Sequence, residues 1–265
     1  MEGIDVFDKD GRVDWTAVKN SGKTFAFVKA TEGVTIKDSA FAHHWQTMKT
    51  VGIIRGAYHF LHSRTSDPVD QAKEFLKTVG KLEPGDLPPV LDVEAIDKGG
   101  NKQEVIDAAK QWLAEVEKAL LQQTQKPIKP IIYTYPNFWE EDLDNPSDFA
   151  SYPLWIAHYN VKVPHIPSAW QGQYLIHQYD DDVPGVAGVS GRADLNRFNP
   201  LQLEDSGLRV KQLQQQLKDI GLYTDAIDGH FSESVKDAIV SFQTSKGLQA
   251  DGIVGIKTWV ALLWI

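Results

Sequence analysis

The stretch Pro88-Pro89-Val90-Leu91-Asp92-Val93-Glu94 places two carboxylates two residues apart at the end of an apolar run typical of a buried β-strand. Side chains alternate across a strand, so Asp92 and Glu94 are expected to point to one face, about 6 to 7 Å apart along the backbone. Two like charges at the end of an apolar strand raise the proton affinity of at least one of them. The stretch therefore predicts a carboxyl group able to donate a proton near neutrality. The alternative is a solvated strand end with one carboxylate capping the next loop.

On both sides of this stretch, short β-rich runs alternate with helical patterns, as in repeated β-α units. The predicted strands cover residues 3–7, 24–30, 53–61, 89–95, 131–135, 154–159, 175–179 and 193–198. The predicted helices between them cover residues 14–21, 39–51, 68–79 and 103–123. Eight strands favour a closed barrel, but the connections after residue 135 are short loops rich in Pro, Asp and Asn. The predicted fold class is therefore α/β, an irregular (β/α)8 TIM-like barrel with a small C-terminal three-helix domain.

Acidic and aromatic residues gather at the carboxyl ends of the predicted strands, where parallel α/β barrels carry their chemistry. The acids Asp5, Asp92, Glu94 and Asp194 are candidate catalytic residues. The candidate substrate-binding residues are Glu32, Tyr58, His59, Tyr133, Tyr135, Trp155, Tyr159 and Gln178. The first and last strands of a closed barrel are neighbours, which predicts that Asp5 lies beside Asp194. Sugar rings stack on aromatic side chains and their hydroxyls need polar partners, so this composition favours saccharide binding and hydrolysis.

Composition excludes several other classes of protein. The 27 basic and 36 acidic residues give a net charge of −9 without a concentrated Lys/Arg run, so a nucleic-acid partner is not expected. The absence of cysteine removes disulfides, thiolate metal sites and cysteine nucleophiles. No H-E-x-x-H motif is present, so no metal or other cofactor is expected. A cation held by Asp5, His59, Asp92 and Asp194 is the weaker alternative.

The chain has neither a basic and then apolar leader nor an apolar segment of membrane-spanning length. No membrane partner is expected, and the chain is expected to act as a monomer. The missing leader favours a phage endolysin without its own signal peptide, acting on the cell wall from outside or at the wall itself. Removal of a signal from the chain explains the same observation equally well.

Eight short motifs, in order along residues 1–200, carry a family resemblance. They are Gly3-Ile4-Asp5-Val6, Phe27-Val28-Lys29-Ala30-Thr31-Glu32-Gly33, Gly56-Ala57-Tyr58-His59-Phe60, Leu91-Asp92-Val93-Glu94, Tyr133-Thr134, Leu154-Trp155-Ile156-Ala157-His158-Tyr159, Gln178-Tyr179 and Asp194-Leu195-Asn196. Together they resemble the glycoside hydrolase family 25 muramidases, the Chalaropsis-type lysozymes of bacteria and phage lysins. The stretch Phe7-Asp8-Lys9-Asp10-Gly11 replaces the small polar residue and tryptophan that usually follow the first aspartate, so the details of the subsite near the first strand are expected to differ.

The resemblance implies cleavage of the β-1,4 bond between N-acetylmuramic acid and N-acetylglucosamine in bacterial peptidoglycan. By the same resemblance Glu94 is the general acid and Asp92 the second carboxylate, while Asp5 and Asp194 complete the acidic cluster. Two other classes stay open. A non-catalytic saccharide-binding barrel should have lost the acid, and an N-acetylglucosaminidase or chitinase-like enzyme would share the chemistry but cut elsewhere.

The spacing of Asp92 and Glu94 bears on the mechanism. Paired carboxylates act as acid and nucleophile, or as acid and base on a water, depending on their separation. Two residues on one face of one strand approach the sugar from the same side and fit neither arrangement well. The spacing favours a substrate-assisted route, in which the substrate's 2-acetamido oxygen attacks the anomeric carbon. Asp92 would position the acetamido group and Glu94 would protonate the leaving oxygen.

The chain changes character after the predicted catalytic domain, residues 1–201. A polar linker, residues 202–207, leads into residues 208–265, where two amphipathic helices each carry a Gln near the middle. An Asp-Gly turn recurs in Asp228-Gly229-His230-Phe231 and Asp251-Gly252-Ile253-Val254, and Phe231 and Val254 are expected in the core. This part resembles the type 1 peptidoglycan-binding domain, which implies that it holds the enzyme on the wall. The alternative is a helical domain that only packs on the barrel. The candidate aromatic wall contacts are Tyr223, His230 and Trp264.

Overall fold

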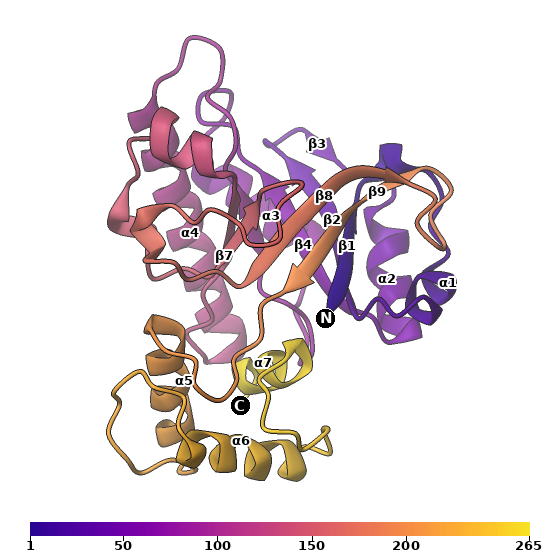
Figure 1. Cartoon of the computed structure of the whole chain (residues 1–265). Helices are drawn as coiled ribbons and strands as arrows, with labels where there is room; N and C mark the ends of the chain where they lie inside the picture. The colour runs from indigo at the N-terminus through magenta and orange to yellow at the C-terminus, as the bar shows by residue number, and fades with distance from the viewer. The chain divides into compact units, whose positions relative to one another are not determined.

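The structure, a computed structural model, describes residues 1–265 and divides into two compact units (Figure 1). One unit spans residues 2–197, and the other contains residues 198–265 together with Met1. None of the helices has the length and apolar character that a membrane span requires. The two units are described separately below.

A closed ring of strands forms the larger unit. The strands are β1 (Glu2–Val6), β2 (Phe25–Glu32), β3 (Ile36–Lys37), β4 (Ile54–Phe60), β5 (Val90–Asp92), β6 (Ile131–Thr134), β7 (Leu154–Ala157), β8 (Ile176–Pro184) and β9 (Arg192–Phe198). Their order is β1-β9-β8-β7-β6-β5-β4-β2, and pairing of β1 with β2 closes the ring, with the short β3 outside it. The predicted irregular eight-stranded barrel is confirmed.

The last strand runs opposite to the others. Neighbouring pairs from β1–β2 through β7–β8 are parallel, whereas β9 is antiparallel to β1. Only residues 185–191 connect β8 to β9, and a parallel return needs a crossover of about a dozen residues or more. The short connection therefore forces the reversed direction, which the predicted irregular (β/α)8 barrel did not include. The expected neighbours Asp5 and Asp194 are register partners.

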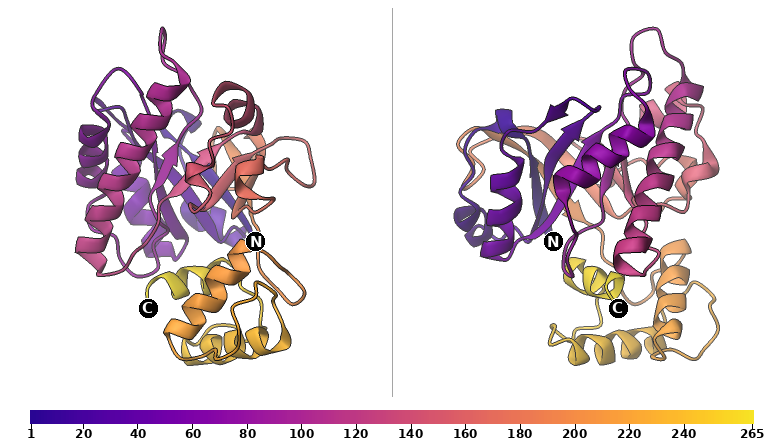
Figure 2. Two further views of the ribbon diagram at one scale, coloured as in Figure 1. Left: turned by 90° about the vertical axis from the view of Figure 1, so that its left-hand side faces the viewer. Right: turned by 180° about the vertical axis from the view of Figure 1, so that it is seen from behind.

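Helices cover only part of the barrel. They are α1 (Trp15–Asn20), α2 (Phe41–Val51), α3 (Pro68–Val79) and α4 (Lys102–Thr124), and Figure 2 shows them on the outer side of the strands. Local capping explains where two of them begin: the Asp67 side chain accepts from two backbone amides of α3, and Asn101 forms a capping box with Glu104 at α4. After β6 the connections contain a single π-turn, Phe138–Asp142, and short 3-10 turns, as the loop-rich sequence predicted.

The smaller unit consists of α5 (Leu208–Asp219), α6 (Glu233–Ser245) and α7 (Ile256–Leu263) around one apolar core. Phe231 and Val254 are buried in that core, as predicted. Tyr223 is buried as well, and its hydroxyl donates to the Ala226 carbonyl, so the expectation of an exposed aromatic at this position is wrong. The helix pattern did not reveal that Tyr223 turns inward after α5.

Two glutamines fix the repeated Asp-Gly turns of this unit in the same way. Gln214 of α5 accepts from the Gly229 amide at 2.8 Å and donates to the Asp228 carboxylate at 2.7 Å. Gln243 of α6 accepts from the Gly252 amide at 2.9 Å and donates to Asp251 at 3.1 Å. Both turn glycines have positive φ, 81° and 73°, which glycine adopts without steric cost. The recurring Gln and Asp-Gly elements are therefore one duplicated hydrogen-bonding unit.

The barrel interior is filled by aromatic rings from opposite strands. Phe27 of β2 stacks on Trp155 of β7, with ring centroids 4.4 Å apart. Gly56 of β4, the register partner of Phe27, leaves room for this ring, because a Cβ at Gly56 would lie 2.2 Å from Phe27 Cδ1. The stacked pair therefore depends on the missing side chain at position 56.

We expect Gly56→Ala to destabilise the barrel by about 1–3 kcal/mol, because the added methyl forces Phe27 and Trp155 out of place. Urea unfolding followed by tryptophan fluorescence measures the change. Phe27→Leu supplies the control background, because a smaller side chain should relieve the clash and make the two substitutions less than additive. Equal destabilisation in both backgrounds would contradict this account of Gly56.

Candidate active site

One pocket opens among the strand ends of the barrel. Its lining residues are Asp5, Tyr58, Asp92, Glu94, Tyr133, Trp155, Gln178 and Asp194. The cavity among these side chains has a volume of about 100 Å³ and opens to solvent. All eight residues were among the sequence-based candidates, and they come from seven strands or the residues directly after them.

The geometry of β5 brings Asp92 and Glu94 to the same pocket. Asp92 is the last residue of β5, and the Val93 amide donates to the Tyr133 carbonyl at 2.9 Å, so the chain stays extended past the strand. Val93 is buried on the opposite face, and the two carboxylates line the pocket together. Asp92 is 6% exposed, and its Oδ1 has no hydrogen-bond partner. A buried carboxylate oxygen without a partner is costly unless a ligand supplies one.

Burial dominates the electrostatics of this pair. Desolvation and then the charge of Glu94 raise the pKa of Asp92 well above its usual range. Desolvation also raises the pKa of Glu94, whereas the nearby Lys29 ammonium lowers it. Because the pKa of each carboxyl group is raised by its surroundings, the pair retains a proton at a pH where an exposed pair would have lost both.

Asp5 and Asp194 form a second acidic pair beside the first. Gln178 Nε2 donates to Asp5 Oδ2 at 2.9 Å and to Asp194 Oδ2 at 3.3 Å, and Asn196 Nδ2 donates to Asp5 Oδ2 at 2.6 Å. Burial, followed by the charge of Asp194, raises the pKa of Asp5. Burial also raises the pKa of Asp194. The amide donors satisfy these carboxyl oxygens without supplying a positive charge.

Gln178 also fixes the direction of two tyrosine hydroxyls. Tyr133 and Tyr159 both donate to Gln178 Oε1, at 2.8 and 2.9 Å. Since Gln178 Nε2 is directed to the carboxylates, its Oε1 must face the tyrosines, and their hydroxyl protons are already used. The two phenol oxygens are therefore left as acceptors, suited to sugar hydroxyl or N–H donors.

The remaining candidates lie around or away from the pocket. Tyr159 is bonded to Gln178, which lines the pocket, and Tyr135 is 36% exposed. Glu32 pairs with Lys29 and His62 and does not line the pocket. His59 is fully buried, bonded to Thr31 and Gln71 and stacked on Trp112, so the expectation that it binds substrate is wrong.

The position of His59 follows from strand alternation. Tyr58 faces the pocket, so the next residue on β4 must face the surrounding helices. The weaker alternative of a cation held by Asp5, His59, Asp92 and Asp194 also fails on this geometry, because His59 does not reach the carboxylates. Nowhere in the structure are three or more His, Cys, Asp or Glu side chains arranged so that they could hold a metal ion.

Two residues of the site were missed in the sequence, Asn196 and Lys29. Asn196 holds Asp5 and accepts from Trp155 Nε1 at 2.8 Å. Lys29 lowers the pKa of both Asp92 and Glu94. Strand periodicity contained the signal, because Asn196 is two residues from Asp194 and Lys29 is two residues from Phe27, whose ring fills the barrel interior.

Paired carboxyl groups with raised pKa values, at the strand ends of a barrel and beside aromatic side chains, define a glycoside hydrolase site. Comparison with known proteins agrees. The family model of glycosyl hydrolases family 25 matches residues 4–188, and that of the putative peptidoglycan binding domain matches residues 206–262. The chain belongs to glycosyl hydrolases family 25, and it is a glycoside hydrolase.

Several known relatives cover three quarters of the chain or more. The autolytic lysozyme of Clostridium acetobutylicum is 35% identical over 97% of this chain and 77% of its own length. Lysozyme M1 of Streptomyces globisporus is 32% identical over 75% of this chain and 68% of its own length. The crystal structure of the bacterial lysozyme from Streptomyces coelicolor superposes with a TM-score of 0.67 at 32% identity, over 75% of this chain and 92% of that one. The predicted lysozyme family is confirmed.

We expect hydrolysis to decline as the pH rises through the raised pKa of Glu94, because the pocket then loses its proton. Lys29→Met removes a cation that lowers this pKa, so the pKa rises and the alkaline limb of the pH–rate profile moves to higher pH. The measurement is kcat/KM against pH on solubilised wall glycan. Lys37→Met is the control, since Lys37 pairs with Glu74 and does not shift the pKa of Glu94. A limb that stays in place or moves to lower pH in Lys29→Met would contradict the role of Lys29.

Proposed function

We propose that this protein is a muramidase, which hydrolyses the β-1,4 bond between N-acetylmuramic acid and N-acetylglucosamine with Glu94 as the general acid and Asp92 as its partner. The observation that carries this proposal is the pair of carboxyl groups in one pocket, Asp92 buried and Glu94 half-buried, with Asp92 Oδ1 left without a partner. Asp5 and Asp194 shape the acidic cluster and hold Gln178.

Substrate binding sets which carboxyl group holds the shared proton. In the free pocket Asp92 is the more deeply buried of the two, which favours its neutral form. A 2-acetamido N–H directed at Asp92 Oδ1 would supply the missing partner and stabilise the carboxylate form. The proton of the pair then resides on Glu94, where it is ready for the leaving oxygen.

Bond cleavage follows from this arrangement. The acetamido oxygen attacks the anomeric carbon while the glycosidic C–O bond breaks and Glu94 transfers its proton to the departing oxygen. Asp92 accepts the hydrogen bond of the acetamido N–H as positive charge develops on the resulting oxazolinium ring. Water then attacks the anomeric carbon, gives its proton to the Glu94 carboxylate and restores the acetamido group. Two displacements at one carbon retain the anomeric configuration.

The pocket walls supply recognition. The phenol oxygens of Tyr133 and Tyr159 act as acceptors for sugar donors, and Tyr58 and Gln178 complete the polar wall. Trp155 forms the floor of the pocket, because it is buried against Phe27 and bonded to Asn196. Tyr135 is exposed and offers a face on which a further sugar of the strand could stack.

We propose residues 1–201 as the catalytic domain, residues 202–207 as a linker and residues 208–265 as a module that binds peptidoglycan. The match of residues 206–262 to the peptidoglycan binding family supports this division. Attachment to the wall raises the local concentration of glycan at the pocket. We propose that the chain acts as a monomer on the bacterial cell wall.

We expect Glu94→Gln to lower kcat on purified peptidoglycan by about 10²–10⁴-fold, the contribution of a positioned general acid. Glu83→Gln is the control, since Glu83 pairs with Lys49 and neither residue lines the pocket. Unchanged lysis by Glu94→Gln would remove the acid from this site.

The bond cleaved and the route are read from the products of the wild-type enzyme. After borohydride reduction, muramitol ends identify the muramidase. Glucosaminitol ends would identify the glucosaminidase alternative, and no new ends would identify a binding protein. We expect proton NMR of fresh product to show the β anomer, and an α anomer would rule out the substrate-assisted route.

Wall binding by the smaller unit is tested in the full chain carrying Glu94→Gln, which binds glycan without degrading it. Gln243→Leu removes an amide that is 1% exposed and organises a turn, so we expect the fraction sedimenting with purified sacculi to fall about tenfold. Gln215→Leu makes the same substitution at an exposed position of α5 and should bind normally. Full binding by the Gln243 variant, with its module shown to be unfolded, would overturn the proposal.

A further inference from the structure

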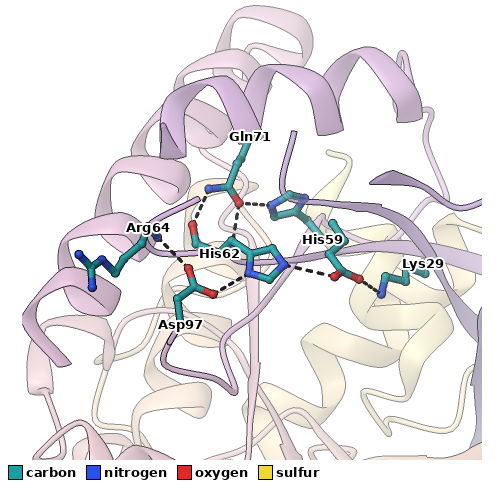
Figure 3. Close-up of polar contacts among 7 residues, drawn as sticks. Lys29, His59, His62, Arg64, Gln71 and Asp97 are labelled. Atoms are coloured by element: carbon teal, nitrogen blue, oxygen red, sulfur yellow. Dashed lines mark hydrogen bonds and ion pairs between the residues drawn. The ribbon is translucent and has the colours of Figure 1, made fainter. Parts of the chain in front are cut away.

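Beside the pocket lies a row of four ionisable side chains that the proposed mechanism does not use. Figure 3 shows the His62 ring between two carboxylates, with Lys29 at the far end of the row. His62 Nδ1 is 2.7 Å from Asp97 Oδ1, and His62 Nε2 is 3.2 Å from Glu32 Oε1. The other oxygen of Glu32 accepts from Lys29 Nζ at 2.5 Å. The charges in the row alternate from Asp97 to Lys29.

We propose that His62 is a positioning residue for the proposed hydrolysis, which acts through Glu32 to hold the Lys29 ammonium beside the Asp92 and Glu94 pair. The inference rests on the proposed function, and it assigns a role to residues that lie outside the pocket lining.

The hydrogen bonds of His62 define its charge state. Both ring nitrogens face carboxylate oxygens, so both must donate while Asp97 and Glu32 are ionised, and the ring is then an imidazolium. Burial alone lowers the pKa of His62, but its bonds to Asp97 and Glu32 outweigh burial and raise it. Burial raises the pKa of Glu32, but its bonds to Lys29 and His62 outweigh burial and lower it.

The backbone and surroundings hold His62 in place. Gln71, buried on α3, accepts from the His62 amide at 3.1 Å and donates to the His62 carbonyl at 2.6 Å, as Figure 3 shows. The Arg64 amide donates to Asp97 Oδ2 at 2.8 Å and fixes the carboxylate on the far side of the ring. His59, also bonded to Gln71, has a pKa lowered to about 4 by burial and is neutral. The groups facing the ring are thus the carboxylates of Asp97 and Glu32, the Lys29 ammonium beyond Glu32, and neutral His59.

The loss of the imidazolium would release Glu32. When the ring becomes neutral it keeps one N–H, and the shorter bond, to Asp97, retains it. His62 Nε2 then presents a lone pair to Glu32 Oε1, so this contact becomes repulsive. Glu32 is left with Lys29 as its only partner in the row, and the two side chains are free to move together away from the pocket.

Lys29 connects this row to the two carboxyl groups of the pocket, Asp92 and Glu94. Its ammonium lies 5.3 Å from the centroid of the Phe60 ring and 5.8 Å from that of Phe7, and it lowers the pKa of both Asp92 and Glu94. Burial makes Glu94 a weak acid, and a nearby cation keeps it strong enough to release its proton to a leaving group. The place of Lys29 therefore bears on the rate, and His62 determines that place through Glu32.

The test is a double-variant cycle on the pH–rate profile, with His62→Leu, Lys29→Met and the double variant compared with wild type in the full chain. We expect His62→Leu to move the alkaline limb of kcat to higher pH by about half a pH unit or more, the same direction as Lys29→Met. In the Lys29→Met background, His62→Leu should move the limb no further. Shifts that add, or a limb that His62→Leu leaves in place, would overturn the proposal.

Two controls separate positioning from folding. His165→Leu removes another histidine paired with a glutamate, at 2.8 Å from Glu140, and should leave the limb in place. Proton NMR of the His62 ring follows its titration directly, and Glu32→Gln should lower the His62 pKa because it removes one of the two carboxylates. An unchanged His62 pKa in folded Glu32→Gln would also overturn the proposal, whatever His62→Leu does to stability.

The outcome is distinguishable from a failure of the proposed function. If Glu94→Gln retains activity, the acid assignment fails and the pH limb reports another group. If Glu94→Gln is inactive while the His62 and Lys29 effects add, the acid assignment stands and only the positioning role is lost.

Discussion

Burial of carboxyl groups at one end of a closed ring of strands is the constraint on which the rest of the structure depends. Closure through β1 and β2 removes water from Asp5 and Asp92, and burial is the largest cause of the raised pKa of each. An unpaired buried charge is unfavourable, and the fold offsets it with the neutral donors Gln178 and Asn196 on one side and the cation Lys29 on the other. Closure of the barrel therefore also determines how strongly these carboxyl groups hold a proton.

The aromatic residues at the site divide into two kinds. Trp155 is buried beneath the pocket and is stacked on Phe27, so it supports the carboxylates instead of offering a free face. The hydroxyls of Tyr133 and Tyr159 are oriented by a single amide, Gln178, which makes both of them acceptors. The side of the pocket that meets the sugar is therefore rich in acceptors, which matches a ligand whose edges are mostly hydroxyl and amide donors.

Sequence periodicity predicted the architecture and the lining of the pocket, because strand ends converge in a barrel and alternation decides which residues face inward. The same alternation, applied to β4, places His59 outside once Tyr58 is inside, so the two residues could not both face the pocket. The reversal of β9 follows from the short connection before it, and the length of that connection can be read from the sequence. The row from Asp97 to Lys29 was not predictable, because His62 and Asp97 lie on loops whose course no periodicity determines.

The duplicated turn of the smaller unit has a consequence for how such a module diversifies. Gln214 and Gln243 bond to backbone groups of the turns and to the Asp that begins each turn, and each also donates to one hydroxyl outside the turn, that of Tyr223 or Thr258. Their bonds to His230 and Ile253, the residues after the glycines, go to the backbone carbonyls and not to the side chains. His230 and Ile253 are exposed and differ in side-chain chemistry, whereas the two turns that carry them have the same backbone conformation at glycine. Substitutions at positions 230 and 253 would therefore change the outer surface of this unit while the duplicated turns stay intact.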